Sequence, residues 1–385
     1  MNTREFDIIV YGATGFTGRL VAEYLSQQGH KRWAMAGRSA TKLAEVRDAI
    51  GAPGDTPLVT ADADDPASLR AMCNRARTIL TTVGPYQLYG SDLVAACVET
   101  GTSYVDLSGE PAWMREMIDA HAAAAEASGA RIVFSCGFDS IPFDLGVWKL
   151  QQIVIARTGK PAARIKCRVR KMQGGASGGT VASMKATMAA AAKNPKLIAL
   201  LTSSFALTPG FDGPSQPAGL IPEYDRDEGY WAVPFVMAPI NTKNVHRSNF
   251  LLHHAYGTDF TYDEMMLTTI GEAGKAMAEA AAKMNPFGDG KMPAPGEGPS
   301  KEAREAGFYE ILFTAILDDG KRIKLVVKGD RDPGYGSTSK MIAESALALN
   351  ETASGGGIFT PGGLMAAPLL ARLEANAGLS FSEEA

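Results

Sequence analysis

The stretch IIVYGATGFTGRL, which runs from Ile8 to Leu20, decides the fold. Its apolar first half predicts a strand, and Gly12, Gly15 and Gly18 follow in the spacing G-x-x-G-x-x-G. Such a turn lets a pyrophosphate approach the backbone closely, with the free N–H groups of the following helix facing the anion. The alternative is a purely structural bend between a strand and a helix. The neighbouring sequence decides between the two.

The chain on either side of this turn alternates short apolar runs with amphipathic stretches, as a parallel sheet flanked by helices requires. Five helices are predicted between six strands, which completes a doubly wound dinucleotide-binding sheet. We therefore expect an α/β fold with an N-terminal Rossmann domain. The predicted strands are Phe6–Tyr11, Arg32–Ala36, Thr56–Ala61, Thr78–Val83, Tyr104–Leu107 and Arg131–Ser135.

Size and composition fit an enzyme of two domains. The chain has 385 residues, of which 45% are hydrophobic and 21% charged, and a single core stops growing below that length. A net charge of -4 provides no basic face for nucleic acid. The start of the chain resembles no signal peptide and no apolar run is long enough to span a membrane, so we expect a cytoplasmic enzyme. Four widely spaced cysteines predict reduced core thiols: Cys73, Cys97, Cys136 and Cys167.

The choice of dinucleotide is read at the end of the second strand. An NAD enzyme places an acidic residue there for the ribose hydroxyls, but there is none from Tyr24 to Ala44. Arg38 stands at this point with Ser39 beside it, and a guanidinium suits a 2′-phosphate. An arginine merely exposed after a strand is the alternative. We expect NADPH, with Asp62 near the adenine or, alternatively, capping a helix.

Polar residues follow the last three strands of the predicted sheet, where the carboxyl ends line the ligand crevice. We expect Val83, Gly84 and Pro85 to lead toward the nicotinamide. Tyr86 is the first candidate for a proton donor or carbonyl-orienting group, and Asp139 is the second. Taken singly, each polar residue is more often a helix cap or a turn former. The others in this group are Asp106, Ser108, Glu110 and Ser140.

The motifs of several other enzyme classes are absent from the sequence. No Tyr-x-x-x-Lys is present, since Tyr335 and Lys340 are five apart, so the catalytic pair of the short-chain dehydrogenases is missing. The five histidines have no metal-ligand spacing, and there is no P-loop, so we expect no metal site. The glycine run Gly174–Thr180 fits either an anion-binding nest or a flexible joint.

After about Val147 the pattern changes to that of an α+β domain with a mixed sheet. We place the boundaries at residues 1–147, 148–335 and 336–385, with C-terminal helices at Met341–Asn350 and Pro361–Asn376 returning to the first domain. Strands are predicted at Arg164–Lys171, Asn249–Tyr256, Phe308–Leu317 and Lys321–Lys328, the last two as a hairpin. Helices are predicted at Thr180–Lys193 and Met265–Met284.

Taken together, motifs spread over nearly the whole chain resemble the saccharopine dehydrogenase-like oxidoreductases, in the branch of the mycobacterial trans-acting enoyl reductases. The motifs are YGATGFTG (11–18), AGRS (36–39), VGPYQLYG (83–90), YVDLSGE (104–110), CGFDSIPFDLG (136–146), SGGT (177–180) and DPGYGSTSKM (332–341). The resemblance implies an NADP-type Rossmann domain and a second α+β domain. It also implies hydride transfer from NADPH to an activated C=C bond, in an enoyl thioester of lipid or polyketide type.

The resemblance leaves partners and rival functions open. The substrate is expected to be a small molecule or a carrier-tethered acyl chain, with an acyl carrier or polyketide synthase as partner and a homodimer as assembly. The apolar segments Leu197–Leu207 and Tyr230–Pro239, expected to line the pocket, argue against an amino-acid substrate. A non-catalytic NADPH-binding sensor or scaffold and an imine or amino-acid reductase are the alternatives. The expected cofactor-binding residues are Gly12, Thr14, Gly15, Phe16, Thr17, Gly18, Arg38, Ser39, Asp62, Val83, Gly84 and Pro85.

Overall fold

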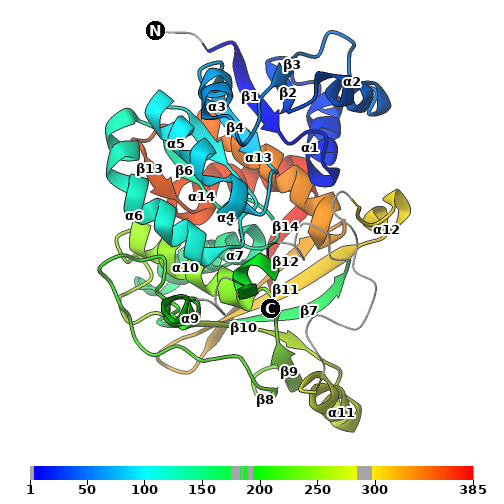
Figure 1. The fold of residues 1–385 in the computed structure, drawn as a ribbon. Coiled ribbons are helices and arrows are strands. Elements are labelled where there is room, and N and C mark those ends of the chain that lie inside the picture. The colour runs from blue at the N-terminus through cyan, green and yellow to red at the C-terminus, as the bar shows by residue number, and fades with distance from the viewer. Residues whose placement is uncertain (1–3, 175–182, 184, 190–193, 284–296, 385) are drawn as a thin grey trace.

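The structure is a computed structural model that describes residues 4–174, 183, 185–189, 194–283 and 297–384. Two sheets of seven strands each organise the chain, and helices lie around and between them. In Figure 1 the N-terminal sheet lies in the upper half and the second sheet in the lower half.

The first sheet is entirely parallel, with the strand order β13-β6-β5-β4-β1-β2-β3. All six predicted strands are confirmed to within a few residues. The seventh, β13, was not predicted, because three residues behind a glycine run show no periodicity. The bounds are β1 Phe6–Tyr11, β2 Trp33–Gly37, β3 Leu58–Thr60, β4 Ala76–Thr81, β5 Ser103–Val105, β6 Arg131–Val133 and β13 Gly357–Phe359.

The helices of this half begin and end where local chemistry requires. Asp65 caps α3 by accepting hydrogen bonds from Ala67 and Ser68, with Pro66 at the first helical position. Gly101 and Gly129 end α5 and α6 in the left-handed conformation. The bounds are α1 Phe16–Gln27, α2 Ala40–Ala49, α3 Pro66–Cys73, α4 Tyr86–Tyr89, α5 Ser91–Thr100 and α6 Pro111–Ser128.

The strand order reverses between β1 and β4. β1 pairs with β2 on one side and with β4 on the other, so the chain leaves β1 in one direction and returns at β4 to build the other half. A doubly wound sheet binds its ligand outside the carboxyl ends of the strands at this reversal. The glycine turn after β1 and the segment after β4 therefore share one crevice.

The second sheet is mixed, with the order β14-β12-β11-β7-β10-β9-β8. Only β7 and β10 pair in parallel; the other neighbours are antiparallel. The predicted hairpin is confirmed as β11–β12, turned at Asp318–Gly320, where Gly320 has a φ of 80°. The bounds are β7 Arg164–Gln173, β8 Glu223–Asp225, β9 Tyr230–Pro234, β10 Thr261–Leu267, β11 Phe308–Ile316, β12 Arg322–Gly329 and β14 Leu379–Glu384.

Helices of the second half pack on both sheets. α7 packs against β11 and β12, whereas α13 returns to pack against α1 and β4, as predicted for the C-terminal helices. The last strand, β14, joins the second sheet instead, so the chain end serves both halves. One core cluster runs through both. The bounds are α7 Ile141–Thr158, α9 Pro195–Thr202, α10 Ala238–Leu251, α11 Gly271–Ala281, α12 Lys301–Glu305, η1 Pro333–Ser337, α13 Thr338–Glu351, α14 Pro361–Arg372 and η2 Leu373–Ala377.

Two predictions for the second half were wrong. The expected strand Asn249–Tyr256 is the end of α10 and a turn in which His253 and His254 have positive φ. The expected helix Met265–Met284 begins as β10, because pairing with β7 on one side and β9 on the other holds Met265 and Met266 extended, and of the predicted range only α11 is helical among the described residues. Of the helix Thr180–Lys193, residues 183 and 185–189 are helical and the rest lies outside the described residues. The glycine run Gly174–Thr180 also lies outside them, except Gly174.

Within the described ranges, no helix combines the length and the apolar character that crossing a bilayer demands.

Candidate active site

Two glycines of the turn after β1 are required by its geometry. Gly12 has a φ of 90°, and a Cβ there would lie 2.8 Å from Val83 Cγ2. A Cβ at Gly18 would lie 2.1 Å from the carbonyl oxygen of Gly12, so α1 packs directly on the turn. Gly15 is different, because its backbone is extended and its position is exposed. Because Gly15 has no side chain, an open space remains above the turn; we call this space the glycine cradle.

This cradle fits the pyrophosphate of a dinucleotide. Gly15 is the N-cap of α1 and has no side chain to bond the first N–H groups of the helix, whose first turn carries no acidic residue. Those N–H groups and the positive end of the helix dipole therefore face outward, where an anion would lie. Thr14, Phe16 and Thr17 flank the cradle and are half-buried.

Arg38 follows β2 directly, is exposed, and makes no ion pair with any residue that the structure describes. Ser39 caps α2, since its hydroxyl accepts a hydrogen bond from the Lys42 N–H at 3.3 Å. Asp62 closes a turn by accepting from the N–H of Asp64, so the alternative of a helix cap at Asp62 was wrong. An unpaired guanidinium beside β2 suits a 2′-phosphate.

Tyr86 is buried, with only 5% of its surface exposed. Its hydroxyl accepts a hydrogen bond from the Leu107 N–H at 3.1 Å and donates one to the Thr81 carbonyl at 3.3 Å. Burial raises its pKa well above the usual value. The hydroxyl thus joins the end of β4 to the end of β5. In this arrangement the hydroxyl proton is bonded to the main chain, and the role of Tyr86 as a proton donor or carbonyl-orienting group stays a prediction.

Glu110 holds the segment after β4 in place. Its carboxylate is 2% exposed and accepts hydrogen bonds from the main-chain N–H groups of Tyr86 at 2.9 Å and of Gln87 at 2.8 Å. It thereby satisfies the first donors of α4, next to Val83, Gly84 and Pro85. Charge-assisted bonds of this kind are stronger than neutral ones. The role of Glu110 is therefore to position this segment.

Asp106 holds the ends of β5 and β6 together in the same way. It accepts hydrogen bonds from the N–H groups of Ser108 at 3.0 Å and Ser135 at 2.9 Å, and from the hydroxyl of Tyr104 at 2.9 Å. Burial raises its pKa to about 7. Ser135 has a φ of 60°, which is rare for a residue other than glycine. A carboxylate bonded on all sides serves to fix the crevice wall.

Asp139 is the carboxyl group whose surroundings suit an acid. It lies half-buried just before α7, and within the described part of the chain its carboxyl makes no hydrogen bond. Burial alone raises its pKa to about 6. The buried Glu264 of β10 lies near enough for the two charges to interact, and burial, followed by weaker repulsion from its acidic neighbours, raises the pKa of Glu264 well above its usual value.

One face of α10 brings further polar groups to this region. Asn241 donates to Glu264 Oε2 at 2.9 Å, and Asn244 donates to Ser140 Oγ at 2.5 Å. The Oδ1 atoms of both asparagines are buried without a partner among the described residues. Sequence reasoning missed this face. The available signal was the i, i+3 and i+7 spacing of Asn241, Asn244 and Ser248, in a stretch for which we predicted no element.

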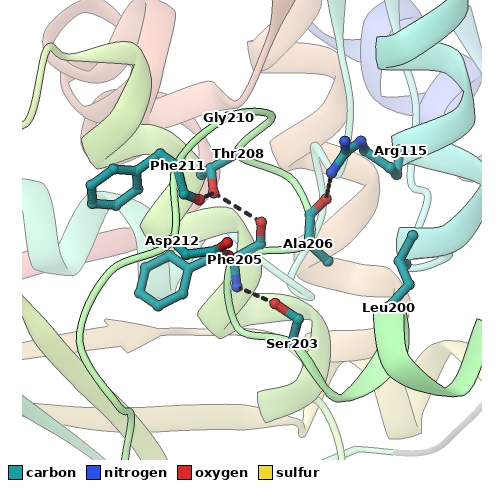
Figure 2. Close-up of a pocket in the computed structure, with 9 residues that line it drawn as sticks. All are labelled: Arg115, Leu200, Ser203, Phe205, Ala206, Thr208, Gly210, Phe211 and Asp212. Carbon is teal, nitrogen blue, oxygen red and sulfur yellow. Dashed lines mark hydrogen bonds between the residues drawn. The ribbon is translucent and has the colours of Figure 1, made fainter.

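One open pocket adjoins α6 and α9 and has a volume of about 260 Å³. Figure 2 shows Arg115 reaching the carbonyl of Ala206, at 2.9 Å, with Phe205 and Phe211 on the opposite wall. The predicted segment Leu197–Leu207 lines it through Leu200, Ser203, Phe205 and Ala206. The other predicted segment, Tyr230–Pro239, lines neither this pocket nor the next, because its first half is β9, near the edge of the second sheet.

A second, smaller pocket lies between α4 and α9. Its walls include Gln87, which follows the crevice segment of β4, and Leu197 and Leu201 of α9. Gln87 donates to Thr187 Oγ1 at 3.2 Å. The apolar helix α9 therefore borders the end of the crevice where a nicotinamide would lie.

These features define a class. They are those of an NADP-dependent oxidoreductase: a parallel sheet with a glycine cradle at its reversal, an arginine after β2, and a second mixed sheet beside the crevice. Residues 8–133 match the family model described as the saccharopine dehydrogenase NADP binding domain. The NADPH prediction is confirmed at the level of this family.

Comparison with known proteins gives the family. The trans-acting enoyl reductase of Mycobacterium tuberculosis (strain H37Rv) is 39% identical over 404 residues, covering 96% of each chain. Another protein of that strain, Rv2449c, is 41% identical over 411 residues, covering 98% of this chain and 97% of the other. The chain belongs to the saccharopine dehydrogenase-like oxidoreductases, with the trans-acting enoyl reductases as relatives.

The fold is shared more widely. Apo saccharopine dehydrogenase (L-Glu forming) from Saccharomyces cerevisiae superimposes with a TM-score of 0.54 at 11% identity, covering 98% of this chain and 99% of that one. At this identity the likeness concerns the fold alone, and it confirms the predicted pair of domains with parallel and mixed sheets.

Proposed function

We propose that this protein reduces the activated C=C bond of an acyl thioester with NADPH. The observation that carries the proposal is the similarity, over nearly the whole chain, to trans-acting enoyl reductases. The glycine cradle and the unpaired Arg38 support NADPH as the reductant. When bound, NADPH supplies a hydride from C4 of its nicotinamide.

We assign the cofactor to residues along the crevice. Gly12, Gly15 and Gly18, with Thr14, Phe16 and Thr17, would enclose the pyrophosphate, and Arg38 would bond the 2′-phosphate with Ser39 beside it. Asp62 would lie toward the adenine. Val83, Gly84 and Pro85, held by Glu110 through α4, would border the nicotinamide.

We propose Asp139 as the acid of the reaction. A hydride added to the β-carbon moves the π electrons to the thioester oxygen, and the enolate then takes a proton at the α-carbon. A half-buried carboxyl with a pKa of about 6 still carries a proton in part of the molecules near neutral pH. Tyr86 keeps a positioning role, because its hydroxyl joins β4 to β5.

The substrate is proposed to arrive tethered to an acyl carrier of a synthase, in the cytoplasm, and the protein to work as a homodimer. Exposed apolar residues that follow lining residues of the smaller pocket in the sequence support an apolar acyl chain near it: Leu88, Tyr89, Met188 and Ile198. We also propose that the domains divide at about residues 147 and 335, since the strands of the second sheet begin at Arg164 and α13 returns to the first sheet.

An imine reductase of saccharopine type is the second candidate, and it would need cationic groups for the carboxylates of an amino acid. The basic residues of α10 instead bond main-chain carbonyls: Lys243 bonds Pro239, and Arg247 bonds Leu207 and Ile358. This favours the acyl substrate. A non-catalytic NADPH sensor is the third candidate, and oxidation of NADPH by the protein with an acyl thioester would exclude it.

The test has two parts. In the first, NADPH and NADH affinities are measured for the wild type, Arg38→Ala and the control Lys31→Ala, which removes an exposed cation at the other end of β2. Arg38→Ala should weaken NADPH binding by roughly tenfold to a hundredfold and leave NADH unchanged, because one charged hydrogen bond is worth about 1.5–3 kcal/mol.

In the second part, oxidation of NADPH is followed with α,β-unsaturated acyl thioesters of increasing chain length, and the saturated thioester is identified by mass spectrometry. Lys31→Ala should behave as the wild type throughout. Equal binding of both dinucleotides by wild type and Arg38→Ala would refute the cofactor assignment. Failure to oxidise NADPH with any such thioester would refute the reaction.

A further inference from the structure

The segment before α12 lies against the glycine turn. A Cβ at Gly298 would lie 2.5 Å from Phe16 Cε1, so this backbone packs directly on the ring of the first residue of α1. In Figure 1, α12 lies at the right, below α1 and just before β11 begins. Residues far along the chain thus meet the pyrophosphate cradle.

Arg304 of α12 completes this contact. Its guanidinium lies 5.5 Å from the centroid of the Phe16 ring, and its Nη1 donates to the Pro299 carbonyl at 2.7 Å. The main-chain carbonyl of Arg304 accepts a hydrogen bond from the Asp332 N–H at 3.0 Å. The Tyr335 ring meets that of Phe16 edge-on at 5.0 Å. Arg304 is therefore fixed, by main chain and side chain, next to the cradle.

Carboxylates near Arg304 act on its charge only through space: Glu302 and Asp332 lie close enough for a coulombic interaction. Within the ranges the structure describes, no carboxylate forms an ion pair with it, and the Asp332 carboxylate bonds the N–H groups of Tyr335 and Gly336. A guanidinium has five N–H donors, of which the Pro299 carbonyl takes one. A guanidinium without an ion-pair partner among the described residues, beside outward-facing helix N–H groups, provides a second positive group for the same anion.

We propose that Arg304 binds the pyrophosphate of the dinucleotide, as a cofactor-binding residue contributed from outside the first domain. This inference rests on the proposed NADPH site and adds a contact to its phosphates. Arg38 and Arg304 would then bind different phosphate groups of the cofactor. Arg38 distinguishes NADPH from NADH, whereas Arg304 contacts a group that both dinucleotides share.

The experiment measures equilibrium binding of NADPH, NADH and adenosine 2′-monophosphate to the wild type, Arg304→Ala, Arg304→Lys and the control Lys301→Ala. Lys301 lies on the same helix, 69% exposed, at 4.0 Å from Glu305. Adenosine 2′-monophosphate has no pyrophosphate, so a variant that binds it normally is folded at the adenine end of the site.

Arg304→Ala should bind both NADPH and NADH roughly tenfold more weakly, as the loss of a charge-assisted contact predicts, and adenosine 2′-monophosphate unchanged. Arg304→Lys should keep part of the affinity, and Lys301→Ala all of it. Affinities for both dinucleotides within twofold of the wild type in Arg304→Ala would overturn the proposal and leave the NADPH site intact. A wild type that binds neither dinucleotide would overturn the proposed function, and this inference with it.

Discussion

Gly18 sets how closely α1 approaches the turn after β1, and Gly15 sets how closely a phosphate does. Gly18→Ala forces a Cβ to 2.1 Å from the Gly12 carbonyl oxygen, so it should lower the free energy of unfolding by about 3 kcal/mol. Gly15→Ala meets that atom only at 3.3 Å and should fold normally, but bind NADPH roughly tenfold more weakly or worse.

Gly54→Ala is the matched control, because a Cβ there meets no atom within 4 Å. Thermal unfolding and NADPH titration of the three variants separate packing from binding. Unchanged stability in Gly18→Ala, or unchanged affinity in Gly15→Ala, would contradict these assignments.

Ionisation of Asp139 should determine how the rate of reduction depends on pH. Burial raises its pKa from 3.8 to about 6, so the reduction rate should fall as the pH rises through about 6, when the acid loses its proton. Asp139→Asn should lower kcat roughly a hundredfold and remove this dependence. Rate–pH profiles of both proteins provide the measurement, with the exposed Asp64→Asn as control. A wild-type profile retained in Asp139→Asn would contradict the assignment.

The raised pKa of Asp139 also makes the free energy of unfolding depend on pH. Above pH about 6 the folded protein holds a desolvated carboxylate whose pKa is raised from 3.8 to about 6, so Asp139→Asn should be more stable than the wild type by up to about 3 kcal/mol. Below pH about 4 both folded and unfolded states are protonated, and the difference should vanish. Urea unfolding at the two pH values would measure it.

At the residue scale, a role that depends on backbone geometry could be predicted from the sequence. A role that depends on the hydrogen-bond partners of a side chain could not. Gly12 and Gly18 could be identified from spacing, because no other residue fits these contacts. The roles of Tyr86 and Glu110 could not be predicted, because they depend on N–H and carbonyl groups of other loops that pattern does not reveal.

At the element scale, β7 depends on ion pairs that cross the second sheet. Arg168 is 1% exposed, and its Nε lies 2.6 Å from Asp225 Oδ2 and its Nη1 2.7 Å from Asp263 Oδ2. Arg168→Ala leaves two buried carboxylates without this partner and should lower the free energy of unfolding by about 3–5 kcal/mol.

Lys160→Ala removes an exposed pair with Asp318 and should change nothing measurable. Chemical unfolding of both variants tests the difference. An Arg168→Ala protein as stable as Lys160→Ala would show that the buried pairs contribute nothing to the second sheet.

Elements of the first half were predictable because both faces of a parallel sheet are buried, which yields apolar runs between amphipathic helices. α10 was not, because its buried side chains are mostly polar and bonded, including Asn241, Asn244 and Arg247. A helix of this kind has no apolar stripe to recognise. β10 was mistaken for helix because its two methionines suit either state.

At the scale of the whole molecule, the last residues close both sheets. β13 pairs with β6, β14 pairs with β12, and Leu379 and Phe381 are buried. A chain ending at Thr352 should therefore lose cooperative unfolding and aggregate, as circular dichroism and size-exclusion chromatography would detect. A truncated protein with the wild-type melting temperature would contradict this closure.

The two-part architecture could be predicted from the sequence, but these closing strands could not. β13 is only three residues long, and its partner β6 lies more than two hundred residues earlier in the chain. Pairing at such separation depends on tertiary packing, here of β13 against α6 and β6, which local pattern does not encode.

The central claim is hydride transfer from NADPH to a C=C bond, and the most direct measurement follows the hydrogen itself. NADPH carrying deuterium at C4 of the nicotinamide is incubated with the protein and an α,β-unsaturated acyl thioester. We expect one of the two C4 stereoisomers to deliver deuterium to the β-carbon of the saturated product. Products without deuterium at that carbon from either stereoisomer, or no product at all, would contradict it.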